Sequence, residues 1–356
     1  MSAWYDLPAD PVLRAAFYLA CGLALVTVLI MVQVLVLSQL AVRRQRERKA
    51  FTATWRPILA LASLSGQPGE VPAAPTGSQE LWFLMLWNRT QRQLRGDARN
   101  RLNQFAVQLG IDRCAIELVR GRGVRRQLVG LATLRSLADE AHWDTIVALV
   151  EHANPFLSLA AAEALVAAAP ARAMQRILPI AATRRDWAIL RLATVCRRAG
   201  REAVTQALLP LLPQAADATS RLFAIIDWAE PARVAPWARD NLGDERPIVQ
   251  RTSATRVLGE LGDPRDRSLL QALLSDPHPD LRLAALRAMR RHFSSDDAGL
   301  LQPLLADPSW WVRQEAADTL VALPGTSRQS LESLARALDD RYGRDALVRA
   351  LAERPA

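Results

Sequence analysis

The sequence predicts an all-α protein in which a single transmembrane helix precedes an α-solenoid, a stack of helical hairpins. Three observations lead to this fold class. Half of the 356 residues are apolar and only 6% are aromatic, which leaves mostly Ala, Leu and Val, a mixture that favours helix over sheet. Residues 15–42 contain no charged side chain. From about residue 115 onward, one pattern of apolar and small residues recurs every 29 to 33 positions.

The uncharged run at residues 15–42 is 28 residues long, whereas about 20 residues suffice to cross the hydrocarbon core of a bilayer. A core helix of a soluble protein is rarely apolar on every face over such a length. A cleaved signal peptide would carry basic residues before the run and would have a shorter apolar region, but the first 13 residues contain no Lys or Arg. We therefore expect residues 15–42 to span a membrane, preceded by a short tail at residues 1–14.

The flanking charges predict the orientation. Five cations follow the run within seven positions, opposed only by Glu47: Arg43, Arg44, Arg46, Arg48 and Lys49. The positive-inside rule then places the N-terminus outside and the C-terminal portion in the cytoplasm, in a bacterial inner membrane. The same five cations are candidates for contact with anionic lipid headgroups, where each basic residue contributes about 1 kcal/mol.

The net charge of +9 is unevenly distributed. Residues 43–126 hold 16 basic and 6 acidic residues, a net +10, whereas residues 127–356 hold 28 of each. A solenoid that binds nucleic acid needs an excess of cations along the array to neutralise phosphates. The balanced array therefore favours lipid contact near the membrane over nucleic acid as the reason for the basic excess.

Residues 43–78 are expected to form a basic juxtamembrane segment and linker, with a short apolar helix at residues 51–61 and a Gly/Pro-rich loop at residues 66–78. Residues 79–114 are expected to form a helical capping region with helices at residues 80–94 and 98–109. The segment from Trp82 to Trp87 is apolar on all sides, so it either seals the end of the array or docks on the membrane or a membrane partner. Trp82 and Trp87 are therefore candidate interface residues.

Residues 115–356 form the predicted solenoid. In each copy an apolar residue is followed by a small residue four positions on and by another residue eight positions on, which places the three on one helix face. The expected inward-facing sets are Val124, Leu128 and Ala132; Leu157, Ala161 and Leu165; Ile189 and Ala193, with an apolar-to-polar exchange at Arg197; Val249, Ser253 and Val257; Leu281, Ala285 and Met289; Val312, Ala316 and Leu320; and Tyr342, Ala346 and Ala350. A weaker copy lies near Leu222 and Ile226, and an apolar helix precedes each copy.

Two turns share the pattern D-P-x-x-x-[LV]-R, beginning at Asp276 and at Asp307. This pattern resembles the short HEAT repeats related to those of phycobilin lyases. The resemblance covers roughly residues 115–351 and is specific only in the last three copies, since Gln250 stands where an earlier arginine is expected. The resemblance implies that the turn Asp and helix Arg are structural, so Asp276, Arg282, Asp307 and Arg313 are not expected to be catalytic.

Sequence motifs for catalysis are absent. The four histidines form no H-E-x-x-H pattern and no His-Glu pair of the kind that HEAT-repeat di-iron hydroxylases use, and there is no phosphate-binding glycine loop. We therefore expect a non-enzyme with no cofactor, no metal and no small-molecule substrate. Trp310 and Trp311 are adjacent tryptophans in a predicted turn, where they either pack on the neighbouring hairpin or anchor a protein partner.

These observations predict a membrane-anchored scaffold that binds protein partners. As a hypothesis about its setting, separate from these observations, we add an inner-membrane complex for polysaccharide synthesis or secretion. Two alternatives stay open. The first is nucleic-acid binding, as in the HEAT-like DNA glycosylases. The second is a lyase-type enzyme subunit, which the family resemblance allows.

Overall fold

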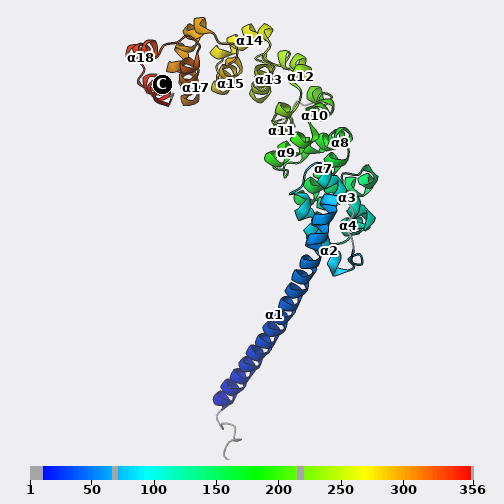
Figure 1. The fold of residues 1–356 in the computed structure, drawn as a ribbon. Helices are drawn as coiled ribbons and strands as arrows, with labels where there is room; N and C mark the ends of the chain where they lie inside the picture. The colour runs from blue at the N-terminus through cyan, green and yellow to red at the C-terminus, as the bar shows by residue number, and fades with distance from the viewer. Residues whose placement is uncertain (1–10, 66–70, 215–219, 354–356) are drawn as a thin grey trace, which may run out of the picture. The chain divides into compact units, whose positions relative to one another are not determined.

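The computed structural model describes residues 11–65, 71–214 and 220–353, and within these ranges it contains helices and turns but no β-strand (Figure 1). The chain divides into two compact units, residues 1–136 and residues 137–356. The predicted tail at residues 1–14 lies mostly outside the described residues, as does the part of the predicted linker at residues 66–70. The boundary between the units falls after Ser136, whereas the sequence placed the start of the array at residue 115.

The first unit is built from five helices. They are α1 (Pro11–Ser65), α2 (Ser78–Gln91), α3 (Asp97–Gln108), α4 (Ile111–Arg120) and α5 (Val124–Leu137). Both helices expected at residues 80–94 and 98–109 are present, as α2 and α3. Residues 71–76, in the second half of the expected linker, have no regular secondary structure.

Helix α1 is continuous over 55 residues, so the short helix expected at residues 51–61 is its final part. The segment between the apolar run and Trp55 consists largely of good helix formers and contains no glycine or proline. Pro57 lies inside the helix, where it removes one backbone donor without ending the helix. Beyond it, Leu59 and Ala62 are buried, and this end of α1 packs against α2 and α3.

Hydrogen bonds connect the helices of the first unit, in addition to their apolar contacts. The Trp87 indole Nε1 donates to the carbonyl of Leu102 at 3.4 Å, and Asn88 Nδ2 donates to Thr133 Oγ1 at 2.8 Å. Arg101 Nε donates to the carbonyl of Ser63 at 3.0 Å, which ties α3 to the end of α1. A buried polar group without a partner would cost free energy, so these bonds allow polar side chains inside the bundle.

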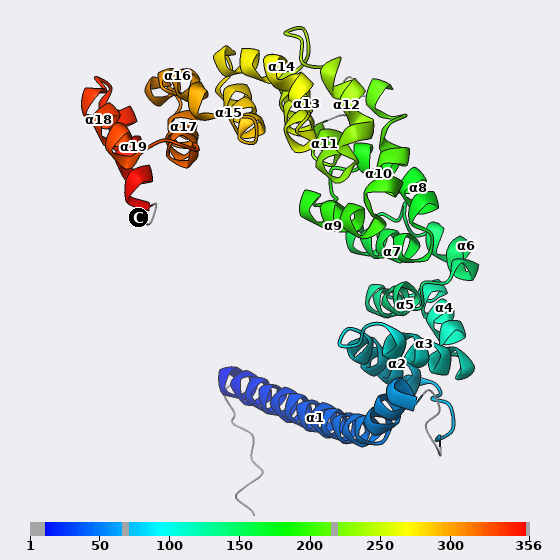
Figure 2. The same ribbon diagram turned by 45° about the horizontal axis from the view of Figure 1, so that its top comes forward.

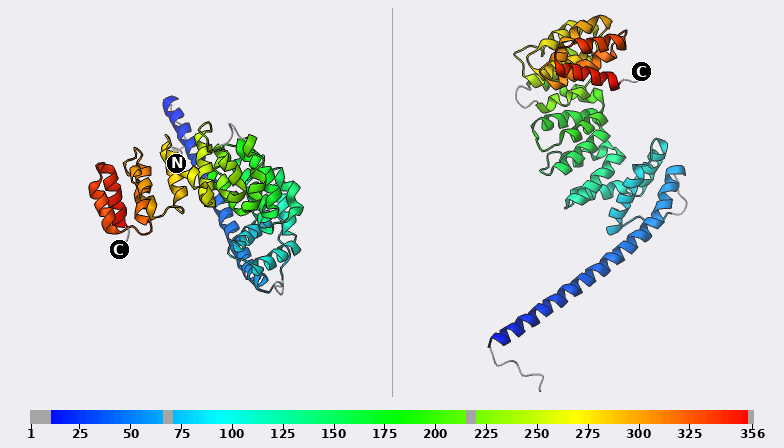
Figure 3. Two further views of the ribbon diagram at one scale, coloured as in Figure 1. Left: turned by 90° about the horizontal axis from the view of Figure 1, so that it is seen from above. Right: turned by 90° about the vertical axis from the view of Figure 1, so that its left-hand side faces the viewer.

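The second unit is a stack of helical hairpins in two layers (Figures 2 and 3). One layer, here called the inner layer, contains α7 (Pro155–Ala168), α9 (Ile189–Ala199), α11 (Ser220–Phe223), α13 (Ile248–Leu261), α15 (Pro279–Met289), α17 (Trp310–Ala322) and α19 (Arg341–Glu353). The other contains α6 (Trp143–Val147), α8 (Pro170–Thr183), α10 (Arg201–Leu208), α12 (Pro231–Arg239), α14 (Arg267–Ala272), α16 (Ala298–Leu301) and α18 (Arg328–Ala337). Short 3₁₀ turns occur at residues 140–142, 212–214, 226–228, 264–266, 273–275, 295–297 and 303–306.

Three of the expected buried triples are confirmed. The triples beginning at Leu157, Leu281 and Val312 are completely buried, and Leu222 and Ile226 of the weaker copy are also buried. These are the copies with an apolar residue at the first position of the true register. The hydrophobic effect selects this face of each helix, and the small middle residue permits close packing.

The other four triples are confirmed only in part or are wrong. Ser253 and Val257 of α13 and Ala346 and Ala350 of α19 are buried as expected, but the first residue of each of these two triples is not. Val249 and Tyr342 are exposed, and the residues that follow them begin the inward-facing positions, which are Gln250, Ala254 and Leu258 in α13, and Gly343, Leu347 and Leu351 in α19. In α9 the buried residues are Leu192, Val195 and Cys196, so Arg197 points outward. In α5 Val124 is exposed, and the buried residues include Leu131 and Leu134.

Glycines allow consecutive hairpins of the array to pack closely. A Cβ at Gly259 of α13 would lie 2.5 Å from the Cα of Ala288 in α15. A Cβ at Gly343 of α19 would lie 2.4 Å from the carbonyl oxygen of Leu305. At these two positions the absence of a side chain determines how closely consecutive hairpins pack.

Candidate interaction surface

Arginines and aspartates connect the turns of consecutive hairpins in a ladder. Arg251 of α13 lies 2.6 Å from Asp276 in the next turn. Arg282 of α15 binds Asp307 in the following turn through two parallel bonds of 2.7 and 2.8 Å. Arg282 also donates to the carbonyl of Asp276, and Arg313 donates to the carbonyl of Asp307. This geometry agrees with the structural role expected for these residues, and it shows that the repeat arginine of α13 is Arg251, one position after Gln250.

Each turn aspartate also orders its own turn. Asp276 Oδ1 accepts from the backbone N–H of His278 at 2.9 Å, and Asp307 Oδ1 accepts from that of Ser309 at 2.8 Å. Burial alone would raise the pKa of Asp276, but the bonds from His278 and from the Arg251 guanidinium outweigh it and lower that pKa. Asp276 is therefore an anionic crosslink between hairpins, and Asp307 makes the same kind of contacts with Arg282 and Ser309.

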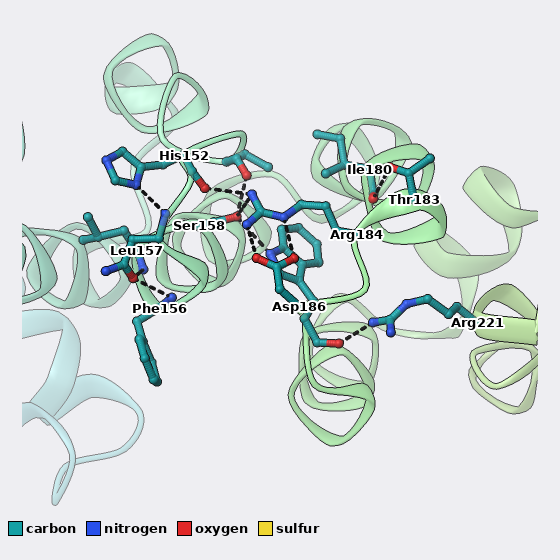
Figure 4. A network of polar contacts seen from close by, with 12 residues as sticks. His152, Phe156, Leu157, Ser158, Ile180, Thr183, Arg184, Asp186 and Arg221 are labelled. Atoms are coloured by element: carbon teal, nitrogen blue, oxygen red, sulfur yellow. Dashed lines mark hydrogen bonds and ion pairs between the residues drawn. The ribbon is translucent and has the colours of Figure 1, made fainter. Parts of the chain in front are cut away.

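A second polar network replaces the ladder in the earlier repeats (Figure 4). Arg184 donates to the carbonyl of His152 at 2.7 Å and to Ser158 Oγ at 3.2 Å, and it pairs with Asp186. The indole of the buried Trp187 donates to the same Ser158 oxygen at 3.0 Å. The groups in this network satisfy one another, so it ties two turns together in the way that the ladder does.

A row of exposed apolar side chains follows the start of the inner-layer helices. The second residue of five such helices is large, apolar and 46% to 84% exposed. These residues, here called the edge row, are Phe156 of α7, Leu190 of α9, Val249 of α13, Trp311 of α17 and Tyr342 of α19. In α15 the same position is Asp280. Because the inner-layer helices stack side by side, their first turns share one edge of the array.

The edge row accounts for most of the exposed apolar groups of the second unit. Among the described residues of the second unit, eight large apolar side chains are exposed. Six of these eight lie in the first two positions of inner-layer helices. The two others are Leu269 and Val348. Folding buries apolar groups, so a repeated exposed one at a fixed position is evidence for an interaction site.

Trp310 and Trp311 lie at the most aromatic part of this edge. Both are exposed, at 53% and 61%, and their rings meet edge to face with centroids 4.5 Å apart. The guanidinium of Arg313 lies 5.3 Å from the ring centre of Tyr342 in the next hairpin. The two tryptophans therefore stack mainly on each other and leave most of their surface accessible to a partner.

The two tryptophans of the first unit that were expected at an interface differ in burial. Trp87 is completely buried against α3, so its assignment as an interface residue is wrong. Trp82 is half-buried, with its ring 6.0 Å from that of Phe51 in α1. The five cations from Arg43 to Lys49 are exposed on α1 directly after the apolar run.

A groove of the second unit lies on the inner layer between α13 and α15, with a volume of about 1040 Å³. Most of its arginines already have acidic partners. Arg256 lies 3.2 Å from Asp227, and Arg287 lies 2.8 Å from Glu315. Such pairing leaves few free cations for a phosphate backbone.

Groups that could perform catalysis are not brought together in the described residues. No cluster of three or more potential metal ligands occurs among them. His152 Nδ1 accepts from the backbone of Asn154, and His278 lies beside Asp276 of the ladder. Burial raises the pKa of the Cys196 thiol to about 12, which keeps it protonated and a poor nucleophile.

Sequence reasoning missed most of the edge row. Phe156 and Leu190 were not singled out, and Val249 and Tyr342 were assigned to the buried face. A signal was available, because Val249, Asp280, Trp311 and Tyr342 are each separated by 31 positions. Aligning the copies on the arginines rather than on the apolar residues places them in one column.

A match to a known family agrees with the architecture of the second unit. Residues 266–352 match the family of HEAT repeats. This part of the chain carries HEAT repeats. No curated protein matches the chain significantly. The crystal structure of an engineered protein aligns at 14% identity over 79% of this chain and 87% of that one, but with a TM-score of 0.31, which is too low to support an argument.

The HEAT-repeat segment contains the ladder from Asp276 to Arg313 and the aromatic part of the edge row. HEAT repeats are in general a scaffold for protein interaction. Outside the array, α1 contains one stretch long and apolar enough to cross a membrane, with a mean hydropathy of 2.7 and none of it buried. A membrane anchor and a signal sequence both have this composition.

Proposed function

We propose that this protein is a membrane-anchored scaffold that binds a protein partner along the edge row of its repeat array. The observation that carries the proposal is the recurrence of an exposed apolar residue at the second position of five inner-layer helices. Trp and Tyr are enriched among the residues that dominate binding energy at protein interfaces. Stacked hairpins supply a long surface on which such residues repeat.

In this proposal α1 crosses the inner membrane once, with its N-terminus outside and the array in the cytoplasm. The long uncharged run supports a membrane span, and the cations from Arg43 to Lys49 support this orientation. The continuity of α1 with the folded first unit also favours a retained anchor, because a signal sequence would be cleaved from the mature protein. The partner is then a protein of the same membrane, in a complex for envelope polysaccharide synthesis or secretion.

The first experiment tests the anchor. Full-length protein is expected to stay in the membrane fraction after carbonate extraction, and its mass is expected to include residues 1–14. Protease added to intact spheroplasts should leave the array undigested, and digestion should follow lysis. A mature mass that lacks the apolar run would identify a signal sequence instead.

The second experiment tests the edge row. Wild-type protein purified from its native host in mild detergent is compared with the double variant Trp310→Ser and Trp311→Ser. We expect a stoichiometric membrane protein to co-purify with wild type and to be lost from the variant.

The matched control is the double variant Leu269→Ser and Val348→Ser, which also removes two exposed apolar side chains but lies off the edge row. It should retain the partner. Equal recovery of the partner with both variants would show that binding uses another surface.

A further inference from the structure

The first unit contains a groove between α1 and α2. It is lined by Arg48 and Thr52 of α1, by Trp82, Met85, Leu86 and Arg89 of α2, and by Arg92 and Gln93 just beyond α2, and its volume is about 540 Å³. The two helices run antiparallel here. Trp55, later in α1, packs on Phe83 near the start of α2, with ring centres 4.9 Å apart, whereas Arg48 lies beside the end of α2. The C-terminal end of α2 is therefore the end that is nearer to the apolar run of α1.

The groove combines three exposed cations with an apolar wall. Arg48 lies on α1, whereas Arg89 lies in the last turn of α2 and Arg92 directly follows this helix, and no carboxylate is among the residues that line the groove. Trp82, Met85 and Leu86 are half-buried and form the apolar side. The last carbonyls of α2 add a partial negative charge of about 0.5, which is small beside three guanidinium groups. The groove therefore suits a ligand with an anionic group and an adjoining apolar part.

The position of the groove along α1 matches the depth of lipid headgroups. Arg48 follows Val42, the last residue of the uncharged run, by six positions. At a rise of 1.5 Å per residue, these six positions correspond to about 9 Å along the helix axis. The headgroup layers extend a bilayer from about 30 Å of hydrocarbon to about 40–45 Å in total, so each is about 5–8 Å thick. A lipid phosphate lies within reach of the arginine side chains.

We propose that this groove binds the headgroup of one anionic phospholipid, with its phosphate held by Arg48, Arg89 and Arg92 and with the carbons of its headgroup alcohol, which project away from the hydrocarbon, against Trp82, Met85 and Leu86. Guanidinium groups bind phosphate oxygens through paired, directional bonds. A free phosphate would use the cations but not the apolar wall, so the lipid satisfies both sides of the groove. Basic pockets beside membrane helices on the cytoplasmic side are suited to such headgroups.

The inference rests on the membrane anchor of the proposed function, but it adds a defined site to the general attraction of cations for lipid. Arg89 and Arg92 belong to no juxtamembrane charge cluster in the sequence. They reach the site only because α2 folds back along α1.

The test is native mass spectrometry of full-length protein released from detergent, with phosphatidylglycerol or phosphatidylcholine added at equal concentration. We expect one phosphatidylglycerol to be retained with at least a tenfold preference over phosphatidylcholine. The triple variant Arg48→Gln, Arg89→Gln and Arg92→Gln should lose this preference. Millimolar inorganic phosphate should not displace the lipid.

The matched control is the triple variant Arg122→Gln, Arg125→Gln and Arg126→Gln, which removes the same charge from exposed positions of the same unit that do not line the groove. It should keep the preference. An unchanged preference in the groove variant, equal loss in both variants, or equal binding of both lipids by wild type would overturn the proposal. Displacement by phosphate would reassign the groove to a soluble anion.

Failure of this test is distinguishable from failure of the anchor. If the protein resists carbonate extraction but shows no lipid preference, only the groove is refuted. If the mature protein lacks residues 15–42, the membrane proposal fails as a whole. Circular dichroism of both triple variants checks that the helices are retained.

Discussion

At the scale of single residues, the turn aspartates carry more of the stability than their place in loops would indicate. Asp307 accepts two bonds from Arg282, whose side chain is only 12% exposed. A buried guanidinium that loses its partner keeps the cost of desolvation and loses the compensating attraction. The ladder therefore resists removal of either member of a pair.

Asp307→Ala is expected to destabilise the array by about 3–5 kcal/mol, the range for breaking a buried ion pair from one side. The measurement is urea unfolding of full-length protein in detergent, followed by circular dichroism. Glu332→Ala is the control, because its pair with Arg328 is exposed and should contribute less than about 1 kcal/mol. Similar unfolding midpoints for the two variants would contradict a structural role for the ladder.

Acid should weaken the ladder through Asp276. The folded pKa of this residue is lowered, so its contribution to stability is complete above the unfolded pKa of about 3.9 and is lost as pH falls through the folded pKa. We expect the melting temperature of wild type to decrease as the pH is lowered below about 4. The Asp276→Asn variant starts lower and should fall less steeply over this range. Parallel curves would exclude Asp276 as a source of acid sensitivity.

Residue patterns identified the ladder better than they identified the edge row. The pattern D-P-x-x-x-[LV]-R marked Asp276, Arg282, Asp307 and Arg313 as structural through its resemblance to short HEAT repeats, in which the turn Asp and the helix Arg bond adjacent hairpins. The edge row also recurs at a spacing of 31, but its members fall into one column only when the copies are aligned on their arginines. Trp311 and Tyr342 are apolar in sequence, and only the packed structure shows that the next residue, not they, faces the core.

At the scale of helices, small residues set the distance between neighbours. Gly259→Ala would place a methyl group 2.5 Å from Ala288, so α13 and α15 must move apart. We expect a loss of about 1–3 kcal/mol in the free energy of unfolding, as for an overpacked core. Urea unfolding at pH 7 provides the measurement.

Gly299→Ala in α16 is the matched control, since a Cβ at Gly299 meets nothing within 4 Å. Alanine has the higher helix propensity, so this variant should be neutral or stabilised by up to about 1 kcal/mol. If both variants were equally destabilised, the loss at Gly259 would have to come from the backbone rather than from contact between helices.

The order and length of the helices were largely predictable, but their register was not. Periodicity located the helices of the array and both α2 and α3. Two copies were misaligned because their first inward position is Gln250 or Gly343, neither of which has an apolar signal. The length of α1 was also missed, since the burial of Leu59 depends on α2 and α3, which are distant in sequence.

At the scale of the whole molecule, the array should respond locally to damage. In stacked repeats each hairpin contacts only its neighbours, so stability is close to a sum of local terms. Hydrogen exchange measured by mass spectrometry should show faster exchange in α13 and α15 of the Gly259→Ala variant. Amides of α2 and α3 in the first unit should be unaffected, and a uniform increase across both units would contradict this independence.

The sequence separates an apolar run from a repeat array, but it gives no sign of a boundary at Ser136. The apolar run and the repeats differ so strongly in composition that the sequence separates them. Helices α4 and α5 have the same composition as the array, and only their contacts assign them to the first unit.

Helix α1 continues without a break from its apolar run into the packed bundle. This continuity determines the direction in which α2 and α3 lie around the axis of α1, relative to the apolar run. One residue inserted between Val42 and Phe51 would turn α2 and α3 by about 100° around the axis of α1. Seven residues would restore their direction to within about 20°, because seven positions come close to two full turns. In the proposed membrane-anchored arrangement, the length of the segment at residues 43–50 therefore determines which side of the bundle faces a neighbour in the membrane.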